Sequence, residues 1–289
     1  MQMTVGVPGH VPDFDPATIP RWARTVEELG FDALSVSDRP SWTTPEPMTA
    51  LAAAAAVTER IGLLTSVVVA PLHVNAGLFA TAAATIDRVA GAGRLRLGLA
   101  PGARPHDYAG APVDFAHRGR VFDTWLDRVR AAWSGAGAGD LGPQPATPGG
   151  PPLLFGGAST PTVRRITDHG SGWIAGGLTP AEVAEFVDRL TRSFETAGRT
   201  DRPHVAVTMM TSIGDHRPGS GLDAVRAYYA DLGSNMRDKA VTATVTTAES
   251  LRDAVTGYES VGVDELILTP NDRDPDTLLS LRRHLMVTV

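Results

Sequence analysis

Two pairs of adjacent glycines each follow a short apolar run and precede a helical pattern, an arrangement suited to binding phosphate. The residues in and beside these two turns are Gly156, Gly157, Ala158, Ser159, Gly176 and Gly177. Glycine allows the backbone to approach a ligand closely, and free N–H groups at the start of a helix attract anions. The alternative interpretation is a pair of ordinary tight turns with Ser or Thr helix caps. Because the two turns follow consecutive strands, we favour a phosphate held between them.

Basic and aromatic side chains follow the first four predicted strands. The candidates for catalysis are Arg39, His73, His106 and His10, and the candidates for substrate contact are Trp42 and Arg104. A cation at this edge stabilises negative charge that develops during a reaction, and a neutral imidazole moves a proton near pH 7. For each residue alone, the alternative is a loop contact or a surface salt bridge. As a group, we expect at least two of the catalytic candidates to face the bound ligand.

Composition and missing motifs exclude several other chemistries. The 289-residue chain has no cysteine, which excludes disulfides and thiol catalysis, and its eight histidines lack metal-ligand spacing. No GxSxG elbow, GxxxxGK phosphate loop or HExxH helix occurs. The formal net charge is −6 and the basic residues form no stripe. We therefore expect neither a metal site nor a nucleic-acid partner.

Short apolar strands alternate with helical patterns along the chain. Strands are predicted over Thr4–Pro8, Ala33–Val36, Ile61–Val69, Leu95–Leu99, Leu153–Phe155, Gly172–Ala175, His204–Ile213 and Glu265–Leu268. Helices are predicted over Ile19–Leu29, Met48–Val57, Asn75–Ala90, Val121–Trp133, Thr160–His169, Pro180–Ala197, Ala224–Leu232, Ala248–Val261 and Asp276–His284. This alternation implies right-handed crossovers between parallel strands.

Eight units of this kind most simply close into a barrel. The alternative is an open doubly wound sheet, which would carry GxGxxG after its first strand if it bound a dinucleotide; this chain has GVPGHVPDFD there. We therefore predict an α/β fold, a single (β/α)8 TIM barrel, with residues 1–289 as one domain. The Gly- and Pro-rich stretch Ser134–Pro152 is predicted to be a long loop.

The alanine-rich helix Met48–Val57 contains the longest apolar stretch. It is too short to span a bilayer, and the N-terminus does not resemble a signal peptide, so we expect a cytoplasmic protein without membrane contact. Small side chains on all sides indicate packing on two faces, which predicts a homodimer. The alternative is a surface helix that tolerates alanine.

The same pieces, taken in order, resemble the bacterial luciferase-like family of reduced-FMN monooxygenases and 8-hydroxy-5-deazaflavin-dependent oxidoreductases. The resemblance runs from Val5 to about Pro270, and the ordered set is more specific than any single motif. The segments that carry it are ARTVEELGFDALSVSD (23–38), LLTSVVVAP (63–71), TIDRVAGAGRLRLGLAPG (85–102), residues 118–133, PLLFGGASTPTVRRITDHGSGWIAGG (152–177) and ESVGVDELILTP (259–270).

The resemblance implies a flavin that lies across the barrel mouth with its phosphate on the two glycine turns. The other cofactor contacts that it implies are Asp38, Ser66, Val67, Pro101 and Gly102, with a cis peptide bond between Ser66 and Val67. Deazaflavin members have a histidine where Arg39 stands, although Asp38 and Trp42 match them. Sugar-phosphate dehydrogenases of the family have a catalytic glutamate where Ala103 stands, so their activity is not expected here.

We therefore predict a flavin-dependent oxidoreductase. The first hypothesis is a reduced-FMN monooxygenase that acts on a small organic substrate, with a separate flavin reductase as a partner. The alternative is a reductase or dehydrogenase that uses 8-hydroxy-5-deazaflavin. A second alternative is a barrel that binds flavin without catalysis, since the chain shows no obvious acid/base pair.

Overall fold

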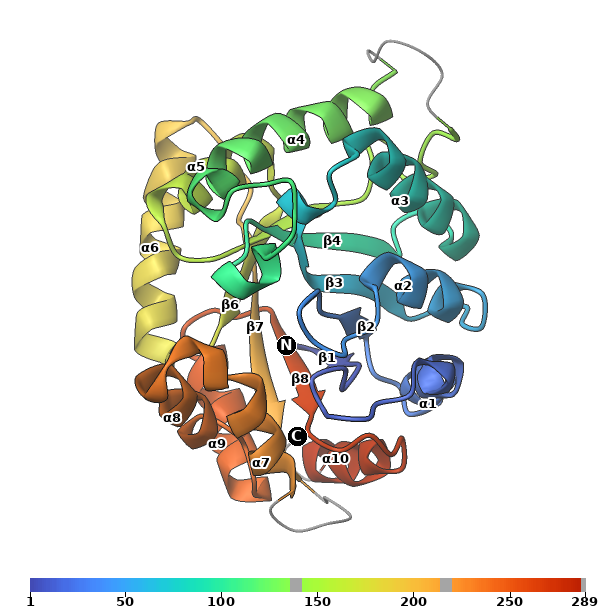
Figure 1. Ribbon diagram of the computed structural model, residues 1–289. Helices are drawn as coiled ribbons and strands as arrows, with labels where there is room; N and C mark the ends of the chain where they lie inside the picture. The colour runs from blue at the N-terminus through green and yellow to red at the C-terminus, as the bar shows by residue number, and fades with distance from the viewer. Residues whose placement is uncertain (136–141, 214–219, 287–289) are drawn as a thin grey trace.

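Eight parallel strands close into a barrel in which each strand pairs with the next and β8 pairs with β1 (Figure 1). The computed structural model describes residues 1–135, 142–213 and 220–286, so part of the predicted loop over 134–152 lies outside the described residues. The strands are β1 (Gln2–Gly6), β2 (Ala33–Val36), β3 (Gly62–Val69), β4 (Leu95–Ala100), β5 (Leu153–Gly156), β6 (Gly172–Gly176), β7 (His204–Thr211) and β8 (Glu265–Pro270). The predicted (β/α)8 barrel is confirmed.

Helices surround the barrel in chain order (Figure 1). They are α1 (Ile19–Glu28), α2 (Pro47–Ala55), α3 (Ala76–Ala90), α4 (Arg118–Trp133), α5 (Thr160–His169), α6 (Pro180–Thr196), α7 (Ser220–Tyr228), α8 (Ser234–Thr242), α9 (Ala248–Glu259) and α10 (Thr277–Met286).

The segment after β7 differs from the sequence-based prediction. The sequence predicts one helix over 224–232, whereas the chain forms α7, a short 3-10 turn at Ala230–Leu232, and α8. Helix α8 buries none of its side chains, so its sequence carries no apolar stripe from which to predict it.

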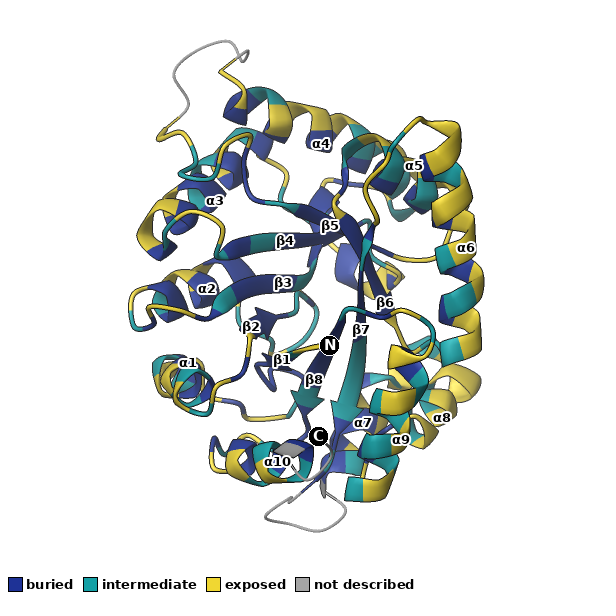
Figure 2. Cartoon of the chain, turned by 180° about the vertical axis from the view of Figure 1, so that it is seen from behind, coloured by how far each residue is buried: buried dark blue, intermediate teal, exposed yellow. Residues whose placement is uncertain are grey.

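The barrel interior is filled by apolar side chains from several strands. The inner cluster consists of Leu64, Leu154, Ile174, Ala206 and Ile267, with Val67 packed against it. A larger cluster lies between the strands and the helices, and Figure 2 shows buried strands surrounded by helices whose outer sides are exposed. Because the interior is packed, a ligand has access only to the ends of the barrel, and enzymes of this architecture use the C-terminal end.

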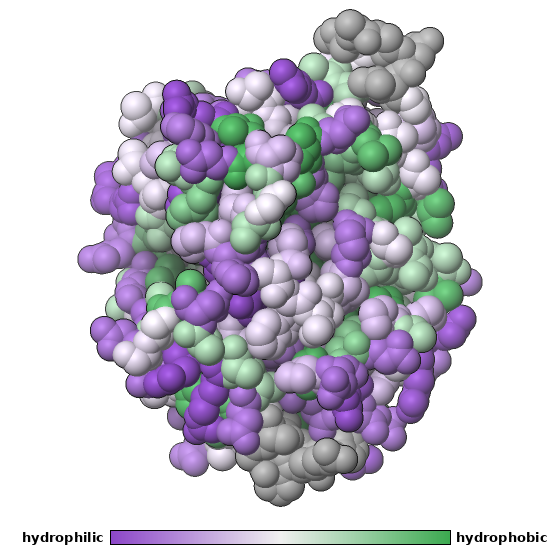
Figure 3. All heavy atoms as spheres, viewed as in Figure 1, coloured by the Kyte–Doolittle hydropathy of each residue, from purple (hydrophilic) through white to green (hydrophobic). Residues whose placement is uncertain are grey.

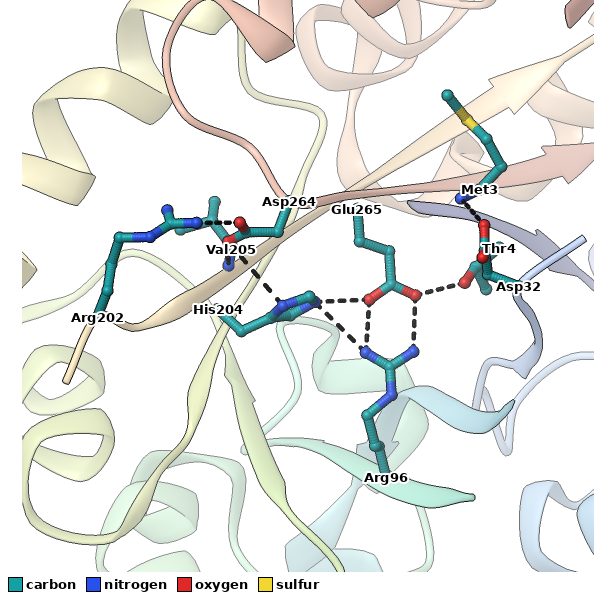
Figure 4. A network of polar contacts seen from close by, with 9 residues as sticks. All are labelled: Met3, Thr4, Asp32, Arg96, Arg202, His204, Val205, Asp264 and Glu265. Carbon is teal, nitrogen blue, oxygen red and sulfur yellow. Dashed lines mark hydrogen bonds and ion pairs between the residues drawn. The ribbon is translucent and has the colours of Figure 1, made fainter. Parts of the chain in front are cut away.

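A polar network fills the other end of the barrel, where the strands begin (Figure 4). Glu265 accepts hydrogen bonds from Arg96 at 2.6 and 2.8 Å and from Thr4, and its Oε2 lies 2.7 Å from His204 Nε2. Burial would raise the pKa of Glu265, but the hydrogen bonds from His204 and Arg96 and the charge of Arg96 lower it to about 2. The network therefore holds an ionised carboxylate that is fully buried.

The alanine-rich helix α2 buries one face against the barrel. Ala50, Leu51, Ala54 and Ala55 are buried, whereas Ala52 is exposed. The neighbouring helix α3 exposes Leu78 and Val89, and Figure 3 shows apolar surface over these two helices on the right of the view. The predicted homodimer remains a prediction. Within the described part of the chain, no helix is long and apolar enough to cross a membrane.

The Glu265 network predicts a pH-dependent stability. Glu265→Gln should lower the free energy of unfolding by about 3 kcal/mol at pH 7, because it removes the charge that Arg96 neutralises. A folded-state pKa of about 2, below the ordinary 4.5, means that the carboxylate stabilises the fold above pH 4.5 and that this contribution is lost as the pH falls toward 2. Urea unfolding at a series of pH values measures the difference.

The control for this measurement is Glu28→Gln, which changes an exposed carboxylate on α1. The control should match the wild type at every pH. A destabilisation by Glu265→Gln that stays constant from neutral to strongly acid pH would contradict the ionised state of Glu265.

Candidate active site

The floor of the barrel mouth is made by β3, β4 and β5. The peptide bond between Ser66 and Val67 is cis, as the resemblance implied, and the register between β3 and β4 shifts between Thr65 and Val68. A Cβ atom placed on Gly156 would lie 3.2 Å from both Val67 Cγ1 and Ala100 Cβ. Small and apolar groups therefore meet where β3, β4 and β5 end at the mouth.

The two predicted glycine turns lie side by side at the ends of β5 and β6, which pair with each other. Gly157 (φ +96°) and Gly177 (φ +65°) have a backbone conformation that favours glycine, and both are exposed. Ser159 caps α5, with its side chain accepting from the N–H of Thr162. Among the described residues, the N–H groups of Gly157, Ala158 and Ser159 have no acceptor. These free donors at a helix N-terminus form a site for an anion.

The loop after β4 borders the floor. Gly102 has φ +73°, and a Cβ atom there would lie 2.8 Å from Val69 Cγ1, so only glycine fits. Arg118 Nε donates to the Gly102 carbonyl at 3.0 Å, and Tyr108 donates to the Pro101 carbonyl at 2.5 Å. Pro101 and Gly102 are thus fixed beside the floor.

Asp38 ties the end of β2 to the irregular part of β3. Its N–H donates to the Val67 carbonyl at 3.2 Å, and its Oδ2 accepts from the N–H of Val69 and from His73 Nε2, each at 3.0 Å. The His73 ring also packs edge-on against Phe79. His73 is therefore a partner of Asp38, and this pair stabilises the loop beside the floor.

A cluster of cationic and aromatic side chains covers another part of the mouth, and we call it the Tyr228 cluster. Its members are Tyr228, at the end of α7, with His10, Arg39, Trp42 and Arg104. The Arg39 guanidinium lies 4.6 Å from the centre of the Trp42 ring and 4.4 Å from that of Tyr228. Arg104 lies 5.0 Å from the Tyr228 ring. Cations stacked on aromatic faces are favourable when they are shielded from water, as here.

Asp231 joins the two arginines of this cluster. Its Oδ2 lies 3.0 Å from Arg39 Nη2, and its Oδ1 accepts from Arg104 Nη1. Partial burial acts to raise the pKa of Asp231, but the hydrogen bond from Arg104 and the charges of both arginines outweigh it and lower the pKa. Asp231 is therefore ionised near neutral pH.

His10 is a neutral member of the Tyr228 cluster. Its Nε2 lies 2.7 Å from Asn271 Oδ1, and the Asn271 amide nitrogen donates to Ser212 Oγ, so the imidazole N–H is the donor to Asn271. Burial lowers the pKa of His10 to about 4, although the hydrogen bond to Asn271 opposes the shift. The carbonyl of His10 accepts from Trp42 Nε1 at 3.0 Å, which fixes the two loops together.

A hollow of about 800 Å³ opens between the loops after β1 and β8 and the start of α7. Its lining is rich in acidic side chains and includes Asp13, Asp15, Asp223, Asp272 and Asp274, with Arg21, Arg273 and Asn271. Asn271 lines this hollow and is also the hydrogen-bond partner of His10.

The structure brings together four of the six side chains that the sequence singled out for catalysis and substrate contact. His10, Arg39, Trp42 and Arg104 meet around Tyr228, whereas His73 is bonded to Asp38. The side chain of His106 is exposed and makes no hydrogen bond or ion pair among the described residues, because the loop after β4 turns it outward.

The sequence analysis did not identify Tyr228 or Asp231. They lie in YYADLG, after the seventh predicted strand, and the two adjacent tyrosines were the available signal. An aromatic pair near a strand end on the mouth side is suited to stacking against cations or planar ligands.

A family model described as luciferase-like monooxygenase matches residues 1–252. Uncharacterised proteins of Mycobacterium tuberculosis and Mycobacterium bovis are 32% identical over 158 residues, which is 52% of this chain and 54% of each relative. The chain thus spans about half the length of the curated relatives it matches.

Solved structures superpose over nearly the whole chain. An F420-dependent secondary alcohol dehydrogenase in complex with an F420–acetone adduct has a TM-score of 0.79 at 16% identity, and the match covers 100% of this chain and 99% of that one. A monooxygenase from Streptomyces bottropensis has a TM-score of 0.83 at 19% identity, with 99% of each chain covered. The coenzyme F420-dependent tetrahydromethanopterin reductase from Methanopyrus kandleri has a TM-score of 0.73 at 15% identity, with 99% and 98% covered. At such identities the likeness shows the fold alone.

The burial of His10 predicts an acid-shifted titration. Nuclear magnetic resonance of the imidazole protons, assigned by comparison with His10→Gln, should give a midpoint near pH 4, since burial disfavours the charged ring. A midpoint near the ordinary 6.5 would contradict the enclosure of His10 within the Tyr228 cluster.

Proposed function

Because the chain belongs to the luciferase-like monooxygenase family, we propose that it is an oxidoreductase whose flavin-type cofactor lies across the mouth of the barrel. The observation that supports this placement best is the pair of exposed glycine turns next to an apolar floor, the first of which has N–H groups without acceptors among the described residues. The turns suit a phosphate, and the floor at Val67 suits a planar ring. We also propose that residues 1–289 act as one catalytic domain.

The residues that would hold the cofactor surround this floor. The phosphate group would accept hydrogen bonds from the N–H groups of Gly157, Ala158 and Ser159, with Gly176 and Gly177 on its other side. The ring would lie on Val67 between Asp38 and Pro101–Gly102. The cofactor supplies the redox chemistry, and the protein supplies its position, its protection from water and the surrounding charges.

The Tyr228 cluster would act on the substrate side. The Arg39 guanidinium, 4% exposed, provides a fixed positive charge where negative charge develops during the reaction. Trp42 and Tyr228 exclude water from this charge. His10 is neutral near pH 7 and is positioned by Asn271, so it serves as a hydrogen-bonding group rather than as a cation.

Monooxygenation with reduced FMN is the first candidate activity. The observation that favours it is the burial of Arg39 between the rings of Trp42 and Tyr228, since exclusion of water protects reactive intermediates from side reactions. A small organic substrate and a separate flavin reductase would then be the partners. We propose in addition that the exposed small and apolar side chains of α2 and α3 form a homodimer interface.

Hydride transfer with coenzyme F420, an 8-hydroxy-5-deazaflavin, is the second candidate. A hollow of about 410 Å³ opens beside Ala158 and Leu178, and the charged side chains that line it are Arg189, Arg192, Glu182 and Glu185. F420 continues beyond its phosphate as an anionic tail, whereas FMN ends there. The hollow and its arginines would accommodate such a tail.

Titration of the purified chain with each cofactor tests the proposal. We expect flavin or deazaflavin fluorescence to change with saturable binding of one of the two, and reduced cofactor to be consumed faster with a suitable substrate. Binding without accelerated turnover for any organic substrate would indicate a non-catalytic barrel. If neither cofactor bound, the proposed function would be wrong.

Ser159→Asp tests the phosphate position. Aspartate and asparagine both cap helices well, so both variants should fold, but only aspartate places a negative charge beside the bound phosphate. We expect Ser159→Asp to weaken cofactor binding by about tenfold or more, and the matched control Ser159→Asn to stay within about threefold. Equal affinities for the two variants would place the phosphate elsewhere.

A further inference from the structure

Two buried guanidinium groups from different loops share a single carboxylate at the mouth. Arg39, after β2, and Arg104, after β4, each contact one oxygen of Asp231. Arg39 is 4% exposed and Arg104 is 8% exposed, whereas the Asp231 side chain is 28% exposed. Two buried positive charges thus face one partly exposed negative charge. The pair of arginines therefore keeps a net positive charge that a bound anion would neutralise.

The arginines also retain unused hydrogen-bond donors. Arg39 Nη1 donates to the Tyr228 carbonyl at 2.5 Å, but its Nε is buried and has no acceptor among the residues that the structure describes. The side chain of Arg104 donates one hydrogen bond in that part of the chain, from Nη1 to Asp231. Asp107, the other carboxylate close to Tyr228, is bonded to the hydroxyl and N–H of Ser41 instead. Buried donors of this kind are normally satisfied, so an oxygen-bearing ligand fits here.

The position of Asp231 allows a ligand to displace its carboxylate from the two arginines. It lies on the three-residue turn between α7 and α8, and Gly233 follows it with φ +84°. The aromatic rings of Trp42, Tyr228 and Tyr229 flank the arginines. Because the Asp231 side chain is partly exposed, a ligand that displaces it meets aromatic rings around a pair of guanidinium groups.

We propose that Arg39 and Arg104 bind a carboxylate group of the organic substrate, and that Asp231 occupies their binding site until the substrate carboxylate replaces it. Guanidinium groups match carboxylate oxygens in geometry and charge, and the aromatic rings would contact the organic part. The substrate class is thus an aromatic or alkyl carboxylate. This inference rests on the proposed function for the reaction, but the binding step itself requires no turnover.

Calorimetric titration of the full-length chain with benzoate and with benzamide tests the proposal. The two probes share their ring and size but differ in charge, so benzoate should bind at least about tenfold more tightly. Asp231→Asn should raise the affinity for benzoate by about tenfold, because it removes the internal competitor. Arg39→Gln and Arg104→Gln should each weaken benzoate binding by a similar factor without changing the affinity for benzamide.

The chain offers a matched control in Asp123, a carboxylate on α4 that contacts both Arg164 and Arg165 at 2.9 and 2.6 Å. Asp123→Asn also removes a carboxylate that two arginines share, but this carboxylate lies outside the mouth. The variant should therefore leave the affinity for benzoate unchanged. Equal binding of benzoate and benzamide by the wild type would overturn the proposal whether or not the variants fold.

Further outcomes are also decisive. Asp231→Asn with unchanged benzoate affinity would overturn the role of Asp231 as a competitor. Inorganic phosphate that binds as tightly as benzoate, and whose binding is weakened by Arg39→Gln and Arg104→Gln, would overturn the assignment to a carboxylate. The same protein is titrated with FMN and F420. If a cofactor binds and benzoate does not, the substrate inference is wrong and the proposed function stands. If benzoate binds and neither cofactor does, the proposed function is wrong and the carboxylate site stands.

Discussion

Closure of the parallel barrel is the constraint on which the candidate site depends. Because β1 pairs with β8 and all strands run in the same direction, the loops after β1, β2, β4 and β7 end on one rim, where the Tyr228 cluster forms. At the opposite end, Glu265 neutralises Arg96 inside the barrel. Among the described residues, the fold thus pairs buried charges at one end and leaves backbone and guanidinium donors without acceptors at the other.

We propose that these donors serve two anion sites of different chemistry, one at the glycine turns and one in the Tyr228 cluster. The glycine turns after β5 and β6 offer neutral backbone N–H groups, which suit a phosphate that remains in contact with water. Arg39 and Arg104 offer full charges in a nearly dry environment, where an ion pair is stronger and more selective. The proposed cofactor and the proposed substrate would therefore be recognised by different groups and meet over the apolar floor.

The sequence was sufficient to predict the features that depend on local residue patterns. It was not sufficient for the features that tertiary contacts determine. The strands, the glycine turns and the position of Ser66–Val67 follow from apolar runs, helix caps and ordered motifs. The direction of a loop side chain does not, which is why His106 is exposed and His73 is bonded to Asp38. Tyr228 and Asp231 were missed because a helix predicted over 224–232 does not show that its C-terminal end and the following turn fold over the mouth. The next helix, α8, buries none of its side chains and gives no further signal.

The most direct test of this account is the crystal structure of the chain with its cofactor bound. We predict that the phosphate lies within hydrogen-bonding distance of the N–H groups of Gly157, Ala158 and Ser159, with the ring on Val67 and Arg39 facing the substrate side. A phosphate held by Arg39 and Arg104 would contradict the account, because it would exchange the roles of the two anion sites.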